Sequence, residues 1–216
     1  MEILFETKEY VAVVKPPELV SEQVGDGSGL GDLFAARNGG YIGVIHRMDR
    51  GVGGVTLYAK DPKTAAFLSE AVREHRLEKV YLAVVEGILC ETEGEMRDLL
   101  YYDRSKNKVY PVKRPRKGVK EAILQYRVLK TARLSDTEQP VSLVEVTPVT
   151  GRTHQIRVQF ASRKHPLLGD RKYGGHGTCG VALACHRITV PPLGNEDAQT
   201  VIYRPAGEPW NLFDTV

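Results

Sequence analysis

The stretch HRMDRGVGG, at residues 46–54, places one carboxylate between two arginines and follows it with a run of glycines. Opposite charges within about 4–6 Å favour the ionised form of a carboxylate. We therefore expect Asp49, flanked by Arg47 and Arg50, to be ionised at neutral pH and able to act as a nucleophile or general base. A solvated charge cluster on a surface turn has the same composition, so this stretch alone does not decide between the two interpretations.

Four blocks of sequence, in the same order, resemble the RluA family of pseudouridine synthases. Residues 46–54 resemble its HR-L-D-x-x-T-S-G signature, with Asp49 at the position of the catalytic aspartate. Residues 79–87 (KVYLAVVEG) resemble K-x-Y-x-A-x-V-x-G, and residues 151–158 read G-R-T-H-Q-I-R-V, like the family's third block. Residues 165–174 (HPLLGDRKYG) resemble H-P-I-x-G-D-x-x-Y-G. The resemblance extends over nearly the whole chain.

The resemblance implies an α+β fold, with a mixed, largely antiparallel β-sheet and flanking helices and loops around a central catalytic cleft. We expect a single catalytic domain over residues 1–216, without the small RNA-binding domain that many family members carry before it. The chain departs from the family pattern at Met48, where leucine is usual, and at Val52-Gly53, where Thr-Ser is usual. These departures concern the backbone around Asp49 and leave the aspartate in place.

By the same resemblance, the expected reaction is the isomerisation of specific uridines to pseudouridine in structured RNA, either ribosomal or transfer RNA. Asp49 would be the essential carboxylate, Tyr81 would pack against the uracil, and Arg157 would form an ion pair with Asp49. The target base must leave its stack to be reached, and Arg47 resembles the family residue placed near the flipped nucleotide. No metal and no cofactor is expected.

A strongly basic stretch supplies the RNA contacts that such an enzyme needs. Residues 106–120 hold seven lysines and arginines and no acidic residue, with Tyr110 among them. Basic clusters with aromatic side chains suit phosphate contact and base stacking, although a solvated hairpin tip has the same composition. The predicted RNA-binding residues are Arg47, Arg50, Arg152, Lys113, Arg114, Arg116 and Lys117.

Hydrophobic periodicity predicts mostly strands and few helices. An N-cap and a proline at the first helical position, Asp61-Pro62, mark the start of the longest helix. The expected strands are residues 3–6, 10–17, 55–59, 80–85, 94–103, 121–129, 141–146, 181–190 and 201–203, and the expected helices are residues 30–37, 62–76 and 154–161.

Composition is ordinary for a globular protein. The chain has 216 residues, 42% of them hydrophobic and 26% charged, with a net charge of +3. This charge is compatible with nucleic-acid binding without requiring it. Three scattered cysteines do not form a disulfide framework, and no secretory signal or membrane-spanning run is visible. We expect a cytoplasmic monomer that binds neither DNA nor a membrane.

Three other interpretations of the sequence are possible. His176, Cys179, Cys185 and His186 are close in sequence, but neighbouring residues on a strand point to opposite faces, so a zinc site fits poorly. His46 and His154 lack a serine or second carboxylate at a recognisable spacing for hydrolysis, so we expect them to be core or hydrogen-bonded histidines. A non-catalytic RNA-binding module with a decayed active site is the alternative function, against which the intact Asp49 argues.

Overall fold

The computed structural model describes residues 2–24, 26–194 and 196–213. The chain divides into two compact units: the first comprises Met1–Val80 and Ala184–Pro205, and the second comprises Tyr81–Leu183 and Ala206–Val216. The single catalytic domain over residues 1–216 stays a prediction, and its ends at residues 1 and 214–216 lie outside the described residues.

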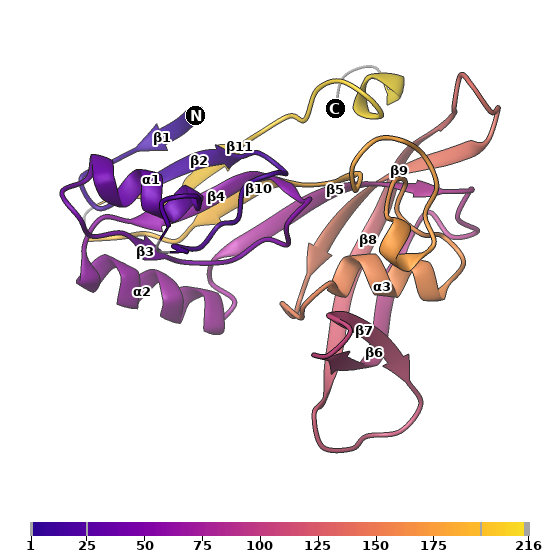
Figure 1. The fold of residues 1–216 in the computed structure, drawn as a ribbon, viewed down its shortest axis with the longest axis horizontal. Coiled ribbons are helices and arrows are strands. Elements are labelled where there is room, and N and C mark those ends of the chain that lie inside the picture. Colours follow the sequence, from indigo (N-terminus) through magenta and orange to yellow (C-terminus); the bar gives the residue numbers. More distant parts are fainter. Residues whose placement is uncertain (1, 25, 195, 214–216) are drawn as a thin grey trace. The chain divides into compact units, whose positions relative to one another are not determined.

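The first unit is built on a mixed sheet (Figure 1). Strand β2 pairs antiparallel with both β1 and β4, whereas β10 pairs parallel with β4. Two short strands join it, β3 beside β4 and β11 beside β10, both antiparallel. The strands are β1 (Ile3–Glu6), β2 (Tyr10–Lys15), β3 (Gly43–Val44), β4 (Gly53–Ala59), β10 (Leu183–Val190) and β11 (Gln199–Ile202).

Two helices pack beside this sheet. In α1 (Leu30–Arg37), Phe34 is buried and its ring stacks on that of Tyr58, with the ring centroids 5.4 Å apart. Helix α2 (Pro62–Arg73) begins after the predicted N-cap, because the Asp61 carboxylate accepts from the backbone N–H of Thr64 at 2.9 Å. No helix in the described part of the chain combines the length and apolar character needed to cross a membrane.

The second unit is built on antiparallel strands in the order β5, β9, β8, β6, β7. Helix α3 (Gln155–Ser162) lies along β6, β7 and β8 in Figure 1. Short 3-10 helices, η1 (Arg171–Tyr173) and η2 (Trp210–Phe213), complete the unit. The strands are β5 (Glu78–Glu86), which begins in the first unit, β6 (Glu93–Asp103), β7 (Lys108–Val112), β8 (Val119–Arg133) and β9 (Pro140–Pro148).

The α+β class and the mixed, largely antiparallel sheet are confirmed, while the central cleft stays a prediction. The expected helices occur, α2 ending three residues early and α3 shifted by one residue. Residues 106–120 do not form a single loop between the expected strands 94–103 and 121–129, because β7 lies inside this stretch and pairs with β6. Val109 is buried against Leu100, Ala122 and Val158, and this tertiary packing outweighs the strand's flanking charges.

Gly54 gives the fold a specific backbone requirement. Its φ is +109°, and an added Cβ would overlap the backbone of Cys185, its partner in the parallel β4–β10 pairing. We expect Gly54→Ala to lower the free energy of unfolding by at least about 3 kcal/mol. Gly39, with φ +74° and nothing within 4 Å of an added Cβ, is the matched control, for which Ala adds only left-handed strain of about 1–2 kcal/mol.

Urea unfolding followed by far-UV circular dichroism measures both variants. Equal losses of unfolding free energy in Gly54→Ala and Gly39→Ala would show that the close approach of Gly54 to Cys185 does not constrain the fold.

Candidate active site

Asp49 is half-buried in a turn that leads directly into β4. The Val52 N–H donates to the Asp49 carbonyl at 3.0 Å, and the Gly51 N–H donates to the carbonyl of Pro17 at 2.8 Å. On the other side of the aspartate, the Met48 N–H donates to Ser21 Oγ at 3.2 Å. The turn is therefore fastened on both sides of Asp49 to the segment that follows β2.

The residues that depart from the family pattern are packed inside the first unit. Met48 and Val52 are 8% and 2% exposed, respectively. A Cβ on Gly53 would lie 3.2 Å from the carbonyl oxygen of Lys15, so this glycine accepts a close neighbouring strand. Apolar side chains on both sides of Asp49 thus anchor the turn by burial.

A buried lysine supplies positive charge near Asp49. Lys15 is 0% exposed, and its ammonium donates to the carbonyls of Leu19 at 2.6 Å and Pro16 at 3.0 Å. Burial lowers the pKa of Lys15 to about 8, against the opposing attraction of Glu18 and Asp49. The sequence analysis missed this residue, whose only signal was a lysine at the end of an apolar strand.

The two arginines beside Asp49 are exposed. The Arg47 guanidinium donates to both carboxylate oxygens of Glu22, each at 3.1 Å, and its side chain is 68% exposed. Exposed ion pairs of this kind contribute about 0–1 kcal/mol. Arg47 is therefore free to exchange Glu22 for another anion at little energetic cost.

His46 is buried, and neither of its ring nitrogens has a hydrogen-bond partner in the described part of the chain. Burial, assisted by the nearby charge of Lys79, lowers the pKa of His46 to about 3. The ring is thus neutral at physiological pH. This agrees with the expectation of a core histidine.

Tyr81 is half-buried on β5, opposite Val146 of β9. Because strand side chains alternate between faces, Tyr81 lies on the opposite face from Leu82 and Val84, which belong to the apolar core of the second unit. Asp49 belongs to the first unit, whereas Tyr81 and Arg157 belong to the second. Their joint approach to one uridine stays a prediction.

Arg157 forms a forked ion pair with Asp170. Its Nε lies 2.7 Å from Asp170 Oδ2 and its Nη2 lies 2.8 Å from Oδ1, and the two side chains are 7% and 1% exposed. Such a pair holds the guanidinium plane in a defined direction. Asp170 was not assigned a role from the sequence, although it lies in the fourth family-like block. The predicted ion pair between Arg157 and Asp49 stays a prediction.

Tyr173 connects Arg157 to its surroundings. The Arg157 Cζ lies 5.3 Å from the centroid of the Tyr173 ring. The Tyr173 hydroxyl accepts from the Val109 N–H at 2.9 Å and lies 2.8 Å from Nδ1 of His154. One tyrosine therefore joins β7, the residue before α3 and the arginine on α3. His154 is hydrogen-bonded, as expected.

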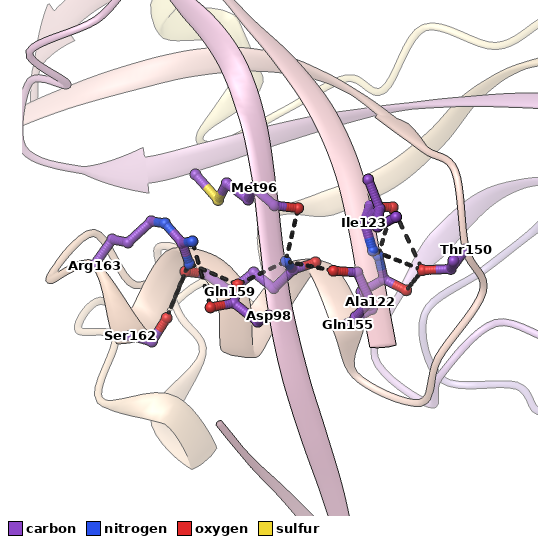
Figure 2. A network of polar contacts seen from close by, with 9 residues as sticks. All are labelled: Met96, Asp98, Ala122, Ile123, Thr150, Gln155, Gln159, Ser162 and Arg163. Carbon is purple, nitrogen blue, oxygen red and sulfur yellow. Dashed lines mark hydrogen bonds and ion pairs between the residues drawn. The ribbon is translucent and has the colours of Figure 1, made fainter. Parts of the chain in front are cut away.

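Two glutamines fasten α3 to the sheet (Figure 2). The Gln159 amide nitrogen donates to the carbonyl of Met96 at 3.2 Å and to Asp98 Oδ2 at 2.7 Å. The Asp98 carboxylate also accepts from Arg163 Nη1 at 2.8 Å, just beyond the end of the helix. These contacts tie the second half of α3 to β6.

The first half of α3 is tied to β8. The Gln155 amide nitrogen donates to the Ile123 carbonyl at 3.0 Å, and Gln155 Oε1 accepts from Thr150 Oγ1 at 2.8 Å and from the Arg152 N–H at 3.0 Å. Figure 2 shows these contacts on the opposite side of the network from Arg163. Arg157, midway between Gln155 and Gln159, is thus placed by anchors on both sides.

The predicted RNA-binding residues Lys113, Arg114, Arg116 and Lys117 are all exposed and lie between β7 and β8. The Arg116 guanidinium stacks over Tyr101, 4.7 Å from the ring centroid. Arg152 is also exposed, and its Nε donates to the Glu121 carbonyl at 2.9 Å. The structure thus brings Arg152 together with the start of β8 in the second unit, whereas Arg47 and Arg50 belong to the first.

No group of three or more histidine, cysteine or carboxylate side chains within the described ranges is arranged to hold a metal ion. His176 and Cys179 belong to the second unit, and Cys185 and His186 to the first. His176 Nδ1 bonds to Glu86 at 3.0 Å, and His186 Nδ1 bonds to the Tyr203 carbonyl at 2.6 Å.

Known proteins resemble this chain. A protein-family model described as RNA pseudouridylate synthase matches residues 9–162. An uncharacterised RNA pseudouridine synthase of Bacillus subtilis (strain 168) is 33% identical over 183 residues, 81% of this chain and 58% of that protein. The ribosomal large subunit pseudouridine synthase D of Borreliella burgdorferi is 36% identical over 132 residues, 61% of this chain and 38% of that protein. The chain spans about half the length of the curated relatives it matches.

A solved structure, human RNA pseudouridylate synthase domain containing 1, has a similar fold. Its TM-score is 0.77 over 94% of this chain and 82% of that one, with 21% sequence identity. At this identity the likeness concerns the fold alone.

Replacing Asp170 by asparagine tests the buried pair. Removing one member of a buried ion pair leaves the other charge with less compensation, so we expect Asp170→Asn to lower the free energy of unfolding by about 3–5 kcal/mol. Glu70→Gln breaks the exposed pair of Arg73 with Glu70 and should cost less than about 1 kcal/mol. Urea denaturation measures the free energy of unfolding of both variants. Similar losses of stability in the two would contradict a special role for the buried pair of Arg157 with Asp170.

Proposed function

Because the chain belongs to the RNA pseudouridylate synthase family, we propose that it isomerises specific uridines to pseudouridine in structured RNA. The family model that matches residues 9–162 confirms the family predicted from the sequence. The observation that carries the proposal is the family match over residues 9–162, which contains Asp49, Tyr81 and Arg157. The activity of this chain is proposed from the family, since it spans only part of its first relatives.

The proposed reaction breaks the bond between ribose C1′ and uracil N1, rotates the base, and joins C1′ to C5. The hydrogen on C5 leaves as a proton, and N1 gains one, so atoms and electrons balance without an oxidant. Asp49 attacks either C1′ or the uracil ring. The hydrogen bonds of the turn support a carboxylate held in one position, and the ammonium of Lys15 attracts it.

The other two residues position the base and the carboxylate. The Tyr81 ring offers a stacking face, and a phenol hydroxyl can help to move the C5 proton. Arg157 directs Asp49 through a guanidinium already oriented by Asp170. Arg47 leaves its exposed pair with Glu22 and stacks near the flipped nucleotide.

The substrate is proposed to be ribosomal or transfer RNA. The Borreliella burgdorferi relative is named for the ribosomal large subunit, which favours testing ribosomal RNA first. Release of tritium from one size class of unmodified total RNA would identify the target molecule.

Asp49→Asn should abolish turnover, because an amide is not nucleophilic and cannot accept a proton at neutral pH. The measurement is tritium release from RNA labelled at carbon 5 of uridine, with binding to the same RNA measured in parallel. Asp136→Asn, an exposed aspartate of the second unit, is the matched control and should retain full activity.

Retained turnover in Asp49→Asn would contradict the assignment of the carboxylate. If the wild type binds this RNA but releases no tritium, the alternative function, a non-catalytic RNA-binding module, replaces the isomerase.

Neutralising the exposed cations between β7 and β8 should weaken RNA binding and flatten its salt dependence. Each lost phosphate contact lowers the slope of log affinity against log salt by about 0.7–0.9. The glutamine variant changes Lys113, Arg114, Arg116 and Lys117, and a matched control of two lysines and two arginines in the first unit changes Lys8, Lys63, Arg73 and Arg76. Fluorescence anisotropy at several salt concentrations measures the RNA affinity of both variants. Equal slopes of log affinity against log salt would exclude the segment between β7 and β8 as a phosphate contact.

A further inference from the structure

A pocket of about 650 Å³ lies within the second unit. Its walls come from four segments of the chain. They are the end of β6 with the turn after it, Val109 of β7, residues 117–120 around the start of β8, and residues 151–153 in the loop before α3. Ligand pockets typically have volumes of about 300–1,000 Å³, so this pocket has room for a nucleotide.

The pocket carries an excess of uncompensated positive charge. Arg104, Lys117, Lys120 and Arg152 line it together with a single carboxylate, Asp103. None of these four cations forms an ion pair within the described part of the chain, although Arg97 on the neighbouring surface pairs with Glu95 and Glu121. Gathering unpaired cations is unfavourable unless an anion binds among them.

Asp103 offsets only part of the positive charge of the four cations, and its carboxylate caps the turn. Its Oδ1 accepts from the Ser105 hydroxyl at 2.7 Å, the Ser105 N–H at 3.0 Å and the Lys106 N–H at 3.2 Å. These hydrogen bonds, that of the Ser105 side chain first, lower the pKa of Asp103. Its role is to hold the turn that presents Arg104.

Arg152 is oriented before any ligand arrives. Its Nε donates to the Glu121 carbonyl at 2.9 Å, and its two terminal nitrogens have no partner among the described residues. Beside it, an added Cβ on Gly151 would meet nothing within 4 Å. The pocket is therefore open next to a fixed guanidinium that can donate two hydrogen bonds to one phosphate.

The aromatic wall favours a base. Arg116 already lies over the ring of Tyr101, but Tyr102 is 38% exposed. The Tyr102 O–H donates to Asn107 Oδ1 at 2.9 Å, which fixes the ring. A fixed, exposed tyrosine offers a stacking surface with little side-chain entropy left to lose.

We propose that this pocket binds a single-stranded nucleotide of the RNA substrate. Its phosphate is held by Arg104, Lys120 and Arg152, and its unpaired base stacks on Tyr102. Bases within a duplex are already stacked and cannot enter a pocket, so the site selects RNA that has an unpaired segment. This proposal rests on the proposed function for the identity of the ligand.

The test measures binding in the Asp49→Asn background, where bound RNA is not converted. The probes are a fluorescein-labelled dodecamer of oligouridine and a labelled RNA duplex of the same length. Loss of two phosphate contacts in Arg104→Gln/Lys120→Gln should lower single-strand affinity about tenfold and its salt slope by about 1.4. Duplex affinity should change less than about twofold, since the duplex makes no use of the pocket.

Matched variants separate the effect of the pocket cations from that of general positive charge, and the effect of stacking on Tyr102 from both. Lys63→Gln/Arg73→Gln removes the same two charges from the first unit and should bind both probes as the parent does. Tyr102→Ala should weaken single-strand binding at least about fivefold, the value of one stacked base, whereas Tyr102→Phe keeps the ring and should bind nearly as the parent.

The proposal is overturned if the pocket variant binds oligouridine like the control variant, or if it loses affinity for both probes equally. Tritium release by the wild type separates the two proposals. Release with unchanged oligouridine binding in the pocket variant overturns the pocket alone. Selective loss of oligouridine binding without any wild-type release overturns the isomerase and supports the pocket.

Discussion

The buried ion pair of Arg157 with Asp170 is the constraint on which the second unit depends. Two charges removed from water are stable only when each is compensated and well oriented, and the forked geometry fixes both side chains. Asp170 is held by its backbone, whose N–H donates to the Leu167 carbonyl at 3.0 Å and whose carbonyl accepts from the Gly175 N–H at 2.9 Å. Arg157 is held by α3. The pair therefore links this loop to α3, in addition to the contacts that Tyr173 makes with His154 and Arg157.

The consequences of this pair extend to the basic surface of the unit. Tyr173 lies three residues beyond Asp170, faces Arg157 and bonds to the backbone of β7 through its hydroxyl. Strand β7 leads into the basic segment, and the loop that starts α3 lines the basic pocket. The arginine proposed to direct Asp49 and the surfaces proposed to hold RNA thus share one rigid support.

Local sequence signals predicted the regular elements well, because Asp61-Pro62 and the alternating strands act within a few residues. The features that were missed depend on tertiary contacts. Strand β7 exists because Val109 is buried among residues from two strands and α3. Asp170 meets Arg157 across 13 positions of chain that follow no helical or strand period. The motif blocks indicated Asp49, Tyr81 and Arg157, but the basic pocket forms only where four separate segments meet.

The central claim is that Asp49 of the first unit and Tyr81 and Arg157 of the second act on one uridine. A crystal structure of Asp49→Asn bound to the RNA from which the wild type releases tritium tests this most directly. The account predicts a flipped uridine with its uracil against the Tyr81 ring, and residue 49 within about 4 Å of the Arg157 guanidinium, the limit for an ion pair. A uridine bound away from residue 49, or Arg157 directed elsewhere, would contradict it.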